Sequence, residues 1–238
     1  TPQIARIAAT LVQDEKGLKL SYSGAVMLAR PEVRGGSRQQ WQTGVECLGV
    51  PGAAGDIEVM HLAARSMMAA GFRKSVLQVG HIGLLKALVA GCEAPLETWT
   101  ALLTRRSPDD LREVINGELI SDDRAEALLA LAEGKGDEQW IADSVGKYGD
   151  DFDLAANELL DLVHEVGDRV EGDVAVYADA AVMPRFLYHS GILFAGFAEG
   201  VSQALLHGGR YDAMMKAHGR DMPATGFSCD LWSLLDSV

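Results

Sequence analysis

A long helix-only stretch, residues 84–172, most constrains the fold of this chain because strand-type sequence flanks it on both sides. Within this stretch apolar residues recur at helical spacing, whereas outside it strand-type runs mix with helical segments. Strands and helices, then helices alone, then strands again indicate an α+β protein with an antiparallel sheet. The strand-type segments are residues 20–28, 39–49, 75–81, 174–177, two within 188–207, and 223–228.

This order divides the chain into a core domain and a helical insertion. We expect residues 1–83 and 173–238 to form one discontinuous core domain, and residues 84–172 to form the insertion. Helices of the insertion are predicted to start after Ser107 and Ser121, which are good N-cap residues followed by proline or acidic side chains. No catalytic pattern lies there. Because the chain opens at Thr1-Pro2 without methionine, we expect a fragment truncated at both ends.

Composition excludes several classes of partner. The chain carries 34 acidic against 21 basic residues, a net charge of -13, which repels nucleic acid. No apolar run approaches the roughly 20 residues that cross a bilayer, so we expect no membrane partner. The three cysteines, Cys47, Cys92 and Cys229, show no metal-type spacing and are predicted to be reduced core thiols of a cytoplasmic protein.

The strand at residues 39–49 has two faces with different chemistry, because side chains alternate along a strand. The odd face, with Trp41 and Val45, is predicted to face the core. The even face carries Gln42 and Glu46 with the side-chain-free Gly44 between them, a floor on which a small polar molecule could bind. The alternative is a half-solvated edge strand with ordinary surface Gln and Glu side chains.

Two glycine-rich segments are predicted to be turns. Residues 49–55 lack the Lys-Ser/Thr ending of a phosphate-binding loop, and Asp56 after them is predicted to cap the next helix. The second segment follows the apolar part of residues 188–212, where Gly208 and Gly209 mark a tight bend or a close backbone approach. A short helix opened by Arg210, Tyr211 and Asp212 is expected beyond it, with Asp212 anchoring the turn.

Four segments in this order, QQWQTGVECLG, VGHIGLL, YHSGILF and GGRYD, resemble class II histidyl-tRNA synthetases and their paralogues, the regulatory subunits of short-form ATP phosphoribosyltransferases. The resemblance covers nearly the whole chain outside the insertion. It implies a class II aminoacyl-tRNA synthetase-like antiparallel sheet flanked by helices. It also implies a histidine site, lined by Gln42, Glu46, Tyr188, His189 and Tyr211, with Gln3, Gly44, Gly208, Gly209 and Arg210 as supporting residues.

Within that resemblance, Gln42 would hold the α-amino group of histidine and Glu46 would face its imidazole. A carboxylate and nearby phenol or imidazole groups satisfy both ring nitrogens of such a ligand, and would be left unpaired by a ligand without them. Synthetases have tyrosines at the positions of His189 and Tyr211. His189 therefore departs from the pattern, although its ring can still donate or accept a hydrogen bond.

The residues that would hold ATP in a synthetase are missing. The arginine that clamps the α-phosphate and the acid two residues later fall on Leu28 and Arg30, and a second arginine falls on Ser233. The arginine that would steady the carboxylate falls near Pro184, with Arg185 one place away. Losing one such electrostatic group typically costs about 100-fold or more in rate, so the loss of several predicts that adenylation does not occur.

The resemblance therefore implies a non-catalytic regulatory subunit, without cofactor or metal, of ATP phosphoribosyltransferase, the enzyme of the first step of histidine biosynthesis. The expected partners are the catalytic subunit, free histidine as effector, and a second copy of this chain within a hetero-oligomer. Two alternatives are an active histidyl-tRNA synthetase and a stand-alone histidine-sensing module. No HExxH, CxxC or G-x-S-x-G pattern occurs, and Asp179 is predicted to be structural.

Overall fold

The computed structural model describes residues 2–11, 17–28, 37–170, 172–184 and 187–235. The described chain divides into two compact units, which are taken separately below. The first consists of residues 1–77, 168–175 and 195–238, and the second of residues 78–167 and 176–194. The strands are β1 (Leu18–Met27), β2 (Gln39–Leu48), β3 (Ser75–His81), β4 (Val174–Ala178), β5 (Ile192–Ala198), β6 (Leu206–Arg210) and β7 (Ala224–Asp230).

The helices alternate with strands at both ends of the chain and follow one another without interruption in its middle. They are α1 (Pro2–Leu11), α2 (Ala53–Ala69), α3 (Ile82–Leu88), α4 (Leu96–Arg105), α5 (Pro108–Asn116), α6 (Asp122–Ala132), α7 (Glu138–Ser144), α8 (Asp150–Arg169), α9 (Asp212–Ala217) and α10 (Leu231–Leu235). This confirms the prediction of helices alone between the strands ending at His81 and beginning at Val174. Within the described segments, no helix is both long enough and apolar enough to cross a membrane.

The strands form one sheet in the order β1-β2-β7-β6-β5-β3-β4. β1 pairs with β2, β2 with β7, and β7 with β6, all antiparallel. The register places Glu46 opposite Gly226 and Gly226 opposite Gly209. Residues far apart in the sequence are thus brought into single rows across the sheet. The antiparallel pairing of these strands confirms the predicted α+β class.

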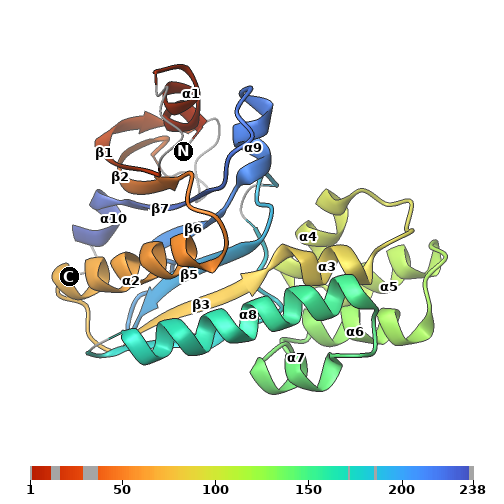
Figure 1. The fold of residues 1–238 in the computed structure, drawn as a ribbon. Helices are drawn as coiled ribbons and strands as arrows, with labels where there is room; N and C mark the ends of the chain where they lie inside the picture. Colours follow the sequence, from red (N-terminus) through yellow and green to blue (C-terminus); the bar gives the residue numbers. More distant parts are fainter. Residues whose placement is uncertain (1, 12–16, 29–36, 171, 185–186, 236–238) are drawn as a thin grey trace. The chain divides into compact units, whose positions relative to one another are not determined.

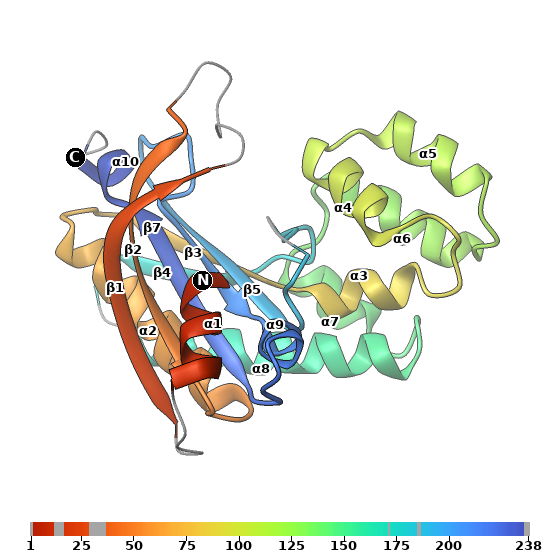
Figure 2. The same cartoon turned by 90° about the horizontal axis from the view of Figure 1, so that it is seen from above.

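In the first unit, helices lie on both faces of β1, β2, β7 and β6. Helix α2 covers one face and contacts β2, β6 and β7, while α1 and α9 contact each other on the opposite side (Figures 1 and 2). On the α2 side Met60 and Met67 are fully buried, and a Cβ on Gly196 would meet Met67 and Leu206. The opposite side carries Glu46 and Tyr211, which are joined by a hydrogen bond.

In the second unit, helices pack on one another through large apolar side chains. Helices α4, α5 and α6 contact one another, and α3 contacts α6. Trp99, Leu128 and Phe152 are each 0% exposed. The Phe152 ring meets Tyr148 edge to face, with ring centroids 4.9 Å apart. This apolar packing explains why a stretch with acidic outer positions forms helices.

Four local predictions were wrong. Gly208 and Gly209 do not form a turn, because they pair with β7 inside strand β6. Residues 49–55 are not all turn, since α2 begins at Ala53 after Gly52, whose φ of 65° suits glycine. Asp56 accordingly lies in the first turn of α2 and does not cap it. The segment Tyr188–Gly191 precedes strand β5 and is not part of it.

Candidate functional site

Along most of β2 the two faces differ in the opposite sense from the prediction, although Cys47 is buried as predicted. Trp41, expected in the core, is 41% exposed, and Val45 is half-buried. On the even face Gln40 is 9% and Glu46 0% exposed. The prediction failed because burial on β2 depends on the elements above and below it, which alternation along one strand does not reveal. The even face is thus a buried polar face and not a solvated edge.

Glu46 and Tyr211 meet on this face. The Tyr211 hydroxyl donates a hydrogen bond to Glu46 Oε2, and the Tyr211 side chain is 2% exposed. The carboxylate fits only because the residue opposite it is glycine: a Cβ on Gly226 would lie 1.9 Å from Glu46 Oε2. A buried carboxylate that accepts a hydrogen bond from a phenol can also recognise another hydrogen-bond donor, such as an imidazole N–H.

Further polar side chains surround this pair in the neighbouring row of the sheet. Gln42 Nε2 donates to Ser228 Oγ at 3.2 Å. Ser228 lies opposite His207 on β6, and both are half-buried. Tyr22 on β1 lies over Gly44, because a Cβ there would be 2.6 Å from the Tyr22 ring and hydroxyl. Glycines therefore provide the floor on which polar groups of four strands converge.

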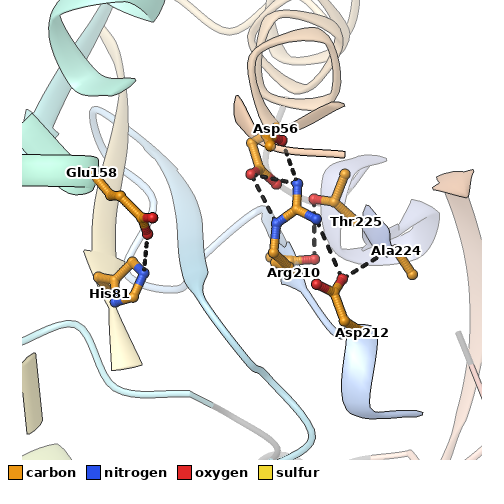
Figure 3. Close-up of polar contacts among 9 residues, drawn as sticks. Asp56, His81, Glu158, Arg210, Asp212, Ala224 and Thr225 are labelled. Carbon is orange, nitrogen blue, oxygen red and sulfur yellow. Dashed lines mark hydrogen bonds and ion pairs between the residues drawn. The ribbon is translucent and has the colours of Figure 1, made fainter. Parts of the chain in front are cut away.

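Arg210 lies on the other face of the sheet, next to α2 (Figure 3). Its Nε and Nη2 donate to Asp56 Oδ2 at 3.0 and 2.7 Å, and Nη2 also donates to the Gly52 carbonyl at 2.8 Å. Nη1 reaches Asp212 Oδ1 at 3.3 Å, and the same oxygen accepts from the Ala224 N–H at 2.7 Å. Arg210 and Asp212 thus join the end of β6 to α2 and β7, and Asp212 anchors the segment after GGRY as predicted.

The Arg210–Asp56 pair is buried, with side-chain exposures of 12% and 5%. Burial raises the pKa of the Asp56 carboxyl, and the Arg210 guanidinium opposes this by attraction and hydrogen bonding. Because a buried carboxylate needs a partner of opposite charge, Asp56 explains why an arginine follows the two glycines. The guanidinium is directed away from the Glu46 face.

Three further residues were predicted for the histidine site. Gln3 is exposed on α1. Tyr188 and His189, in the second unit, stack on each other with ring centroids 4.7 Å apart and an interplanar angle of 26°. The structure therefore brings together Gln42, Gly44, Glu46, Gly209 and Tyr211, and places Gly208 and Arg210 on the opposite face of β6.

His81, also in the second unit, is a buried histidine with a fixed tautomer. Its Nδ1 accepts the Gly83 N–H at 3.0 Å, so Nε2 carries the hydrogen and lies 3.3 Å from Glu158 Oε2 (Figure 3). Burial lowers the pKa of His81 to about 4, with a smaller contribution from Lys86. His81 is consequently neutral at physiological pH and caps the start of α3.

The positions predicted to have lost an ATP-binding arginine hold no cation where they are described. Leu28 is half-buried, Pro184 is buried, and the Ser233 hydroxyl donates to Asp230 Oδ2 at 2.9 Å. Arg30 and Arg185 lie outside the described residues. Among the described residues, no three His, Cys, Asp or Glu side chains are grouped so as to hold a metal ion.

Sequence reasoning missed several residues of the polar face: Tyr22, His207, Ser228 and Gly226. One signal was available, since His207, Gly209 and Tyr211 share a parity on one strand. The register that brings Ser228 opposite His207 was not available, because it depends on how β7 pairs between β2 and β6.

Known proteins similar to this chain share both its sequence and its fold. A family described as histidyl-tRNA synthetase matches residues 1–234. The ATP phosphoribosyltransferase regulatory subunit of Burkholderia mallei is 36% identical over 97% of this chain. That match covers 60% of the relative, so the chain spans less than two thirds of the relatives' length.

Solved structures confirm the class II synthetase-like fold. An ATP phosphoribosyltransferase regulatory subunit/histidyl-tRNA synthetase of Bacillus halodurans covers 99% of this chain and 62% of its own, with a TM-score of 0.85 at 24% identity. A chain of the ATP phosphoribosyl transferase (HisG:HisZ) complex of Thermotoga maritima matches with a TM-score of 0.70 at 15% identity. The match covers 93% of this chain and 76% of the Thermotoga chain. These identities establish the fold alone.

Proposed function

Since the chain belongs to the histidyl-tRNA synthetase family, we propose that it is a non-catalytic regulatory subunit of ATP phosphoribosyltransferase. It binds the catalytic subunit, raises its activity and mediates feedback inhibition by histidine. The observation that carries this proposal is the 36% identity to a relative of that name, extending over 97% of the chain. The assembly is a hetero-oligomer that contains a dimer of this subunit, in the cytoplasm.

Histidine is the effector that the polar face of β2 suits best. The Tyr211 hydroxyl donates to Glu46, and the carboxylate and the phenol oxygen can both accept a hydrogen bond from an imidazole N–H. Gln42 Nε2 donates a hydrogen bond to Ser228, so the amide oxygen of Gln42 can accept one from the α-ammonium group of histidine. A ligand without the imidazole would lose its hydrogen bonds to this pair and would bind more weakly.

At the described positions where a synthetase carries an arginine this chain has no cation, which supports a regulatory rather than a catalytic role. Leu28, Pro184 and Ser233 stand at three positions where a synthetase needs a guanidinium. The arginine nearest to Tyr211 in the sequence, Arg210, is paired with Asp56 on the far side of the sheet. Without a clamp on its α-phosphate, ATP is not held in line for attack by the histidine carboxylate.

Feedback inhibition then requires that histidine bind more tightly to the inactive state of the complex than to the active state, since only a difference in affinity shifts such an equilibrium. The experiment is a phosphoribosyl-transfer assay of the short-form catalytic subunit with and without this protein. The rate should rise on addition of the protein and fall again with histidine. A Glu46→Gln variant should still activate but lose the response to histidine. An equal rate with and without the protein would refute the proposal.

The family description itself favours one second candidate, an active histidyl-tRNA synthetase. That function requires histidine-dependent exchange of pyrophosphate into ATP. A stand-alone histidine sensor, the third reading, would bind histidine but leave the catalytic subunit's rate unchanged. The two assays together separate the three functions.

A further inference from the structure

We propose that His207, together with Ser228, holds the α-carboxylate of the bound histidine, and so determines that the ligand is an amino acid rather than an amine or alcohol with the same ring. This inference rests on the proposed function, because it assumes that histidine binds over β2. It assigns a role to a residue that no motif singled out.

The first step is the face on which His207 lies. Side chains alternate along β6, and two of them are fixed by contacts on opposite sides: Tyr211 reaches Glu46, whereas Arg210 reaches Asp56 on α2. His207 has the parity of Tyr211 and Gly209. Its ring is therefore on the Glu46 side of the sheet, and the half-buried state of the residue agrees with a position at the margin of that face.

The second step is the distance between His207 and the imidazole-binding pair. Glu46, Gly226 and Gly209 form one row across β2, β7 and β6, and Gly44, Ser228 and His207 form the next row on the same face. Rows two residues apart are separated by about 6–7 Å. One histidine molecule spans such a distance from its ring to its carboxylate. A ligand with its ring at Glu46 thus reaches Ser228 and His207 with its other end.

The third step is charge. A carboxylate requires hydrogen-bond donors, preferably with a positive charge. The nearest basic side chain on β6, Arg210, points to the opposite face and already has a carboxylate partner there. His207 can offer an N–H donor, and Ser228 directly across from it offers a hydroxyl at a Cβ separation of about 4.5–5.5 Å. The two donors are adjacent on the Glu46 face.

The test compares ligands that differ only in the group His207 would hold. Calorimetry measures binding of histidine, histidinol and histamine, the last two lacking the carboxylate, to the wild type and to His207→Ala. Histidine should bind about 10- to 100-fold more weakly to the variant, the usual loss of a hydrogen bond to a charged group. Histidinol and histamine, already weak, should change by less than about twofold. His207→Gln, which retains a donor, should recover part of the affinity for histidine.

The matched control is His218→Ala, which removes an exposed imidazole at the end of α9 and should change no affinity. Thermal melting of each variant reports whether it is folded, and His207→Gln carries the test if His207→Ala is not. Equal losses for histidine and histidinol, or no loss for either, would overturn the role of His207 while leaving the proposed function standing. A wild type that binds no histidine at all would overturn both.

Discussion

Replacing Gly226 by alanine tests whether the Glu46–Tyr211 pair is held in place by the glycine opposite it. The added Cβ would lie 1.9 Å from Glu46 Oε2 and 2.5 Å from the Val45 carbonyl oxygen, whereas ordinary contact begins at 3.4 Å. The carboxylate would have to move by about 1.5 Å, which is enough to break its hydrogen bond to Tyr211. The Val45 contact is with backbone, so a side-chain rotation alone does not relieve it.

The magnitude follows from two contributions. Inserting a carbon into a packed region typically costs about 1–3 kcal/mol. Losing a hydrogen bond to a charged group costs about 1.5–3 kcal/mol more. Because a chain of this length loses about 2–4 °C of melting temperature per kcal/mol, we expect a fall on the order of 5–20 °C for Gly226→Ala. Affinity for histidine should fall with it.

The matched control is Gly24→Ala in β1, where a Cβ would meet nothing within 4 Å. That variant should keep the wild-type free energy of unfolding or gain up to about 1 kcal/mol, because alanine restricts the unfolded chain. Urea unfolding of both variants, followed by circular dichroism, is the measurement. Equal stability of Gly226→Ala and Gly24→Ala would refute the close packing of Glu46 against Gly226.

Three further predictions concern other buried groups. Arg210→Met should lower the free energy of unfolding by about 3–5 kcal/mol, because it leaves Asp56 buried without its partner. Adding Asp56→Leu should restore much of this loss. If urea unfolding shows no recovery of stability in the double variant, the prediction is wrong. The folded-state pKa of His81, about 4, lies below the ordinary value of 6.5, so between these pH values the folded protein binds fewer protons than the unfolded chain. The free energy of unfolding should therefore fall by up to about 3 kcal/mol as the pH drops from 6.5 to 4. His81→Asn should flatten that part of the stability profile, and an unchanged slope would show that other groups cause it. Burial raises the pKa of Cys229 to about 11, so its thiol should react with a thiol reagent at pH 8 only after unfolding, as read by mass spectrometry; rapid labelling of the native protein would contradict its burial.

Much of the fold could be predicted from local patterns, because strands and helices are largely specified by their own residues. The strands at 39–48 and 75–81 and the helices of the insertion fall where periodicity and capping residues predict them. The roles of the glycines were predicted less accurately. Gly208 and Gly209 have the composition of a turn, and only their pairing with β7 shows that they lie in a strand. Gly226 was not singled out, since its reason is the carboxylate of Glu46 on another strand.

The candidate site shows the same division. Gln42 and Glu46 were predicted to share a face with Gly44, and alternation alone suffices for that. The burial of that face was predicted wrongly, because it depends on elements that pack on β2 from elsewhere in the chain. Asp56 was assigned to capping by its local position, whereas its actual partner, Arg210, is 154 residues away in the sequence. Long-range partners of charged residues are the part that local sequence reasoning could not supply.

We propose that the chain retains groups for recognising histidine and lacks those that would activate it with ATP. The most direct measurement is exchange of labelled pyrophosphate into ATP in the presence of histidine, performed on protein whose histidine binding is measured in parallel by calorimetry. We expect histidine to bind and the exchange of pyrophosphate to stay at the level of a protein-free control. Histidine-dependent exchange above that level, abolished by Glu46→Gln, would contradict it.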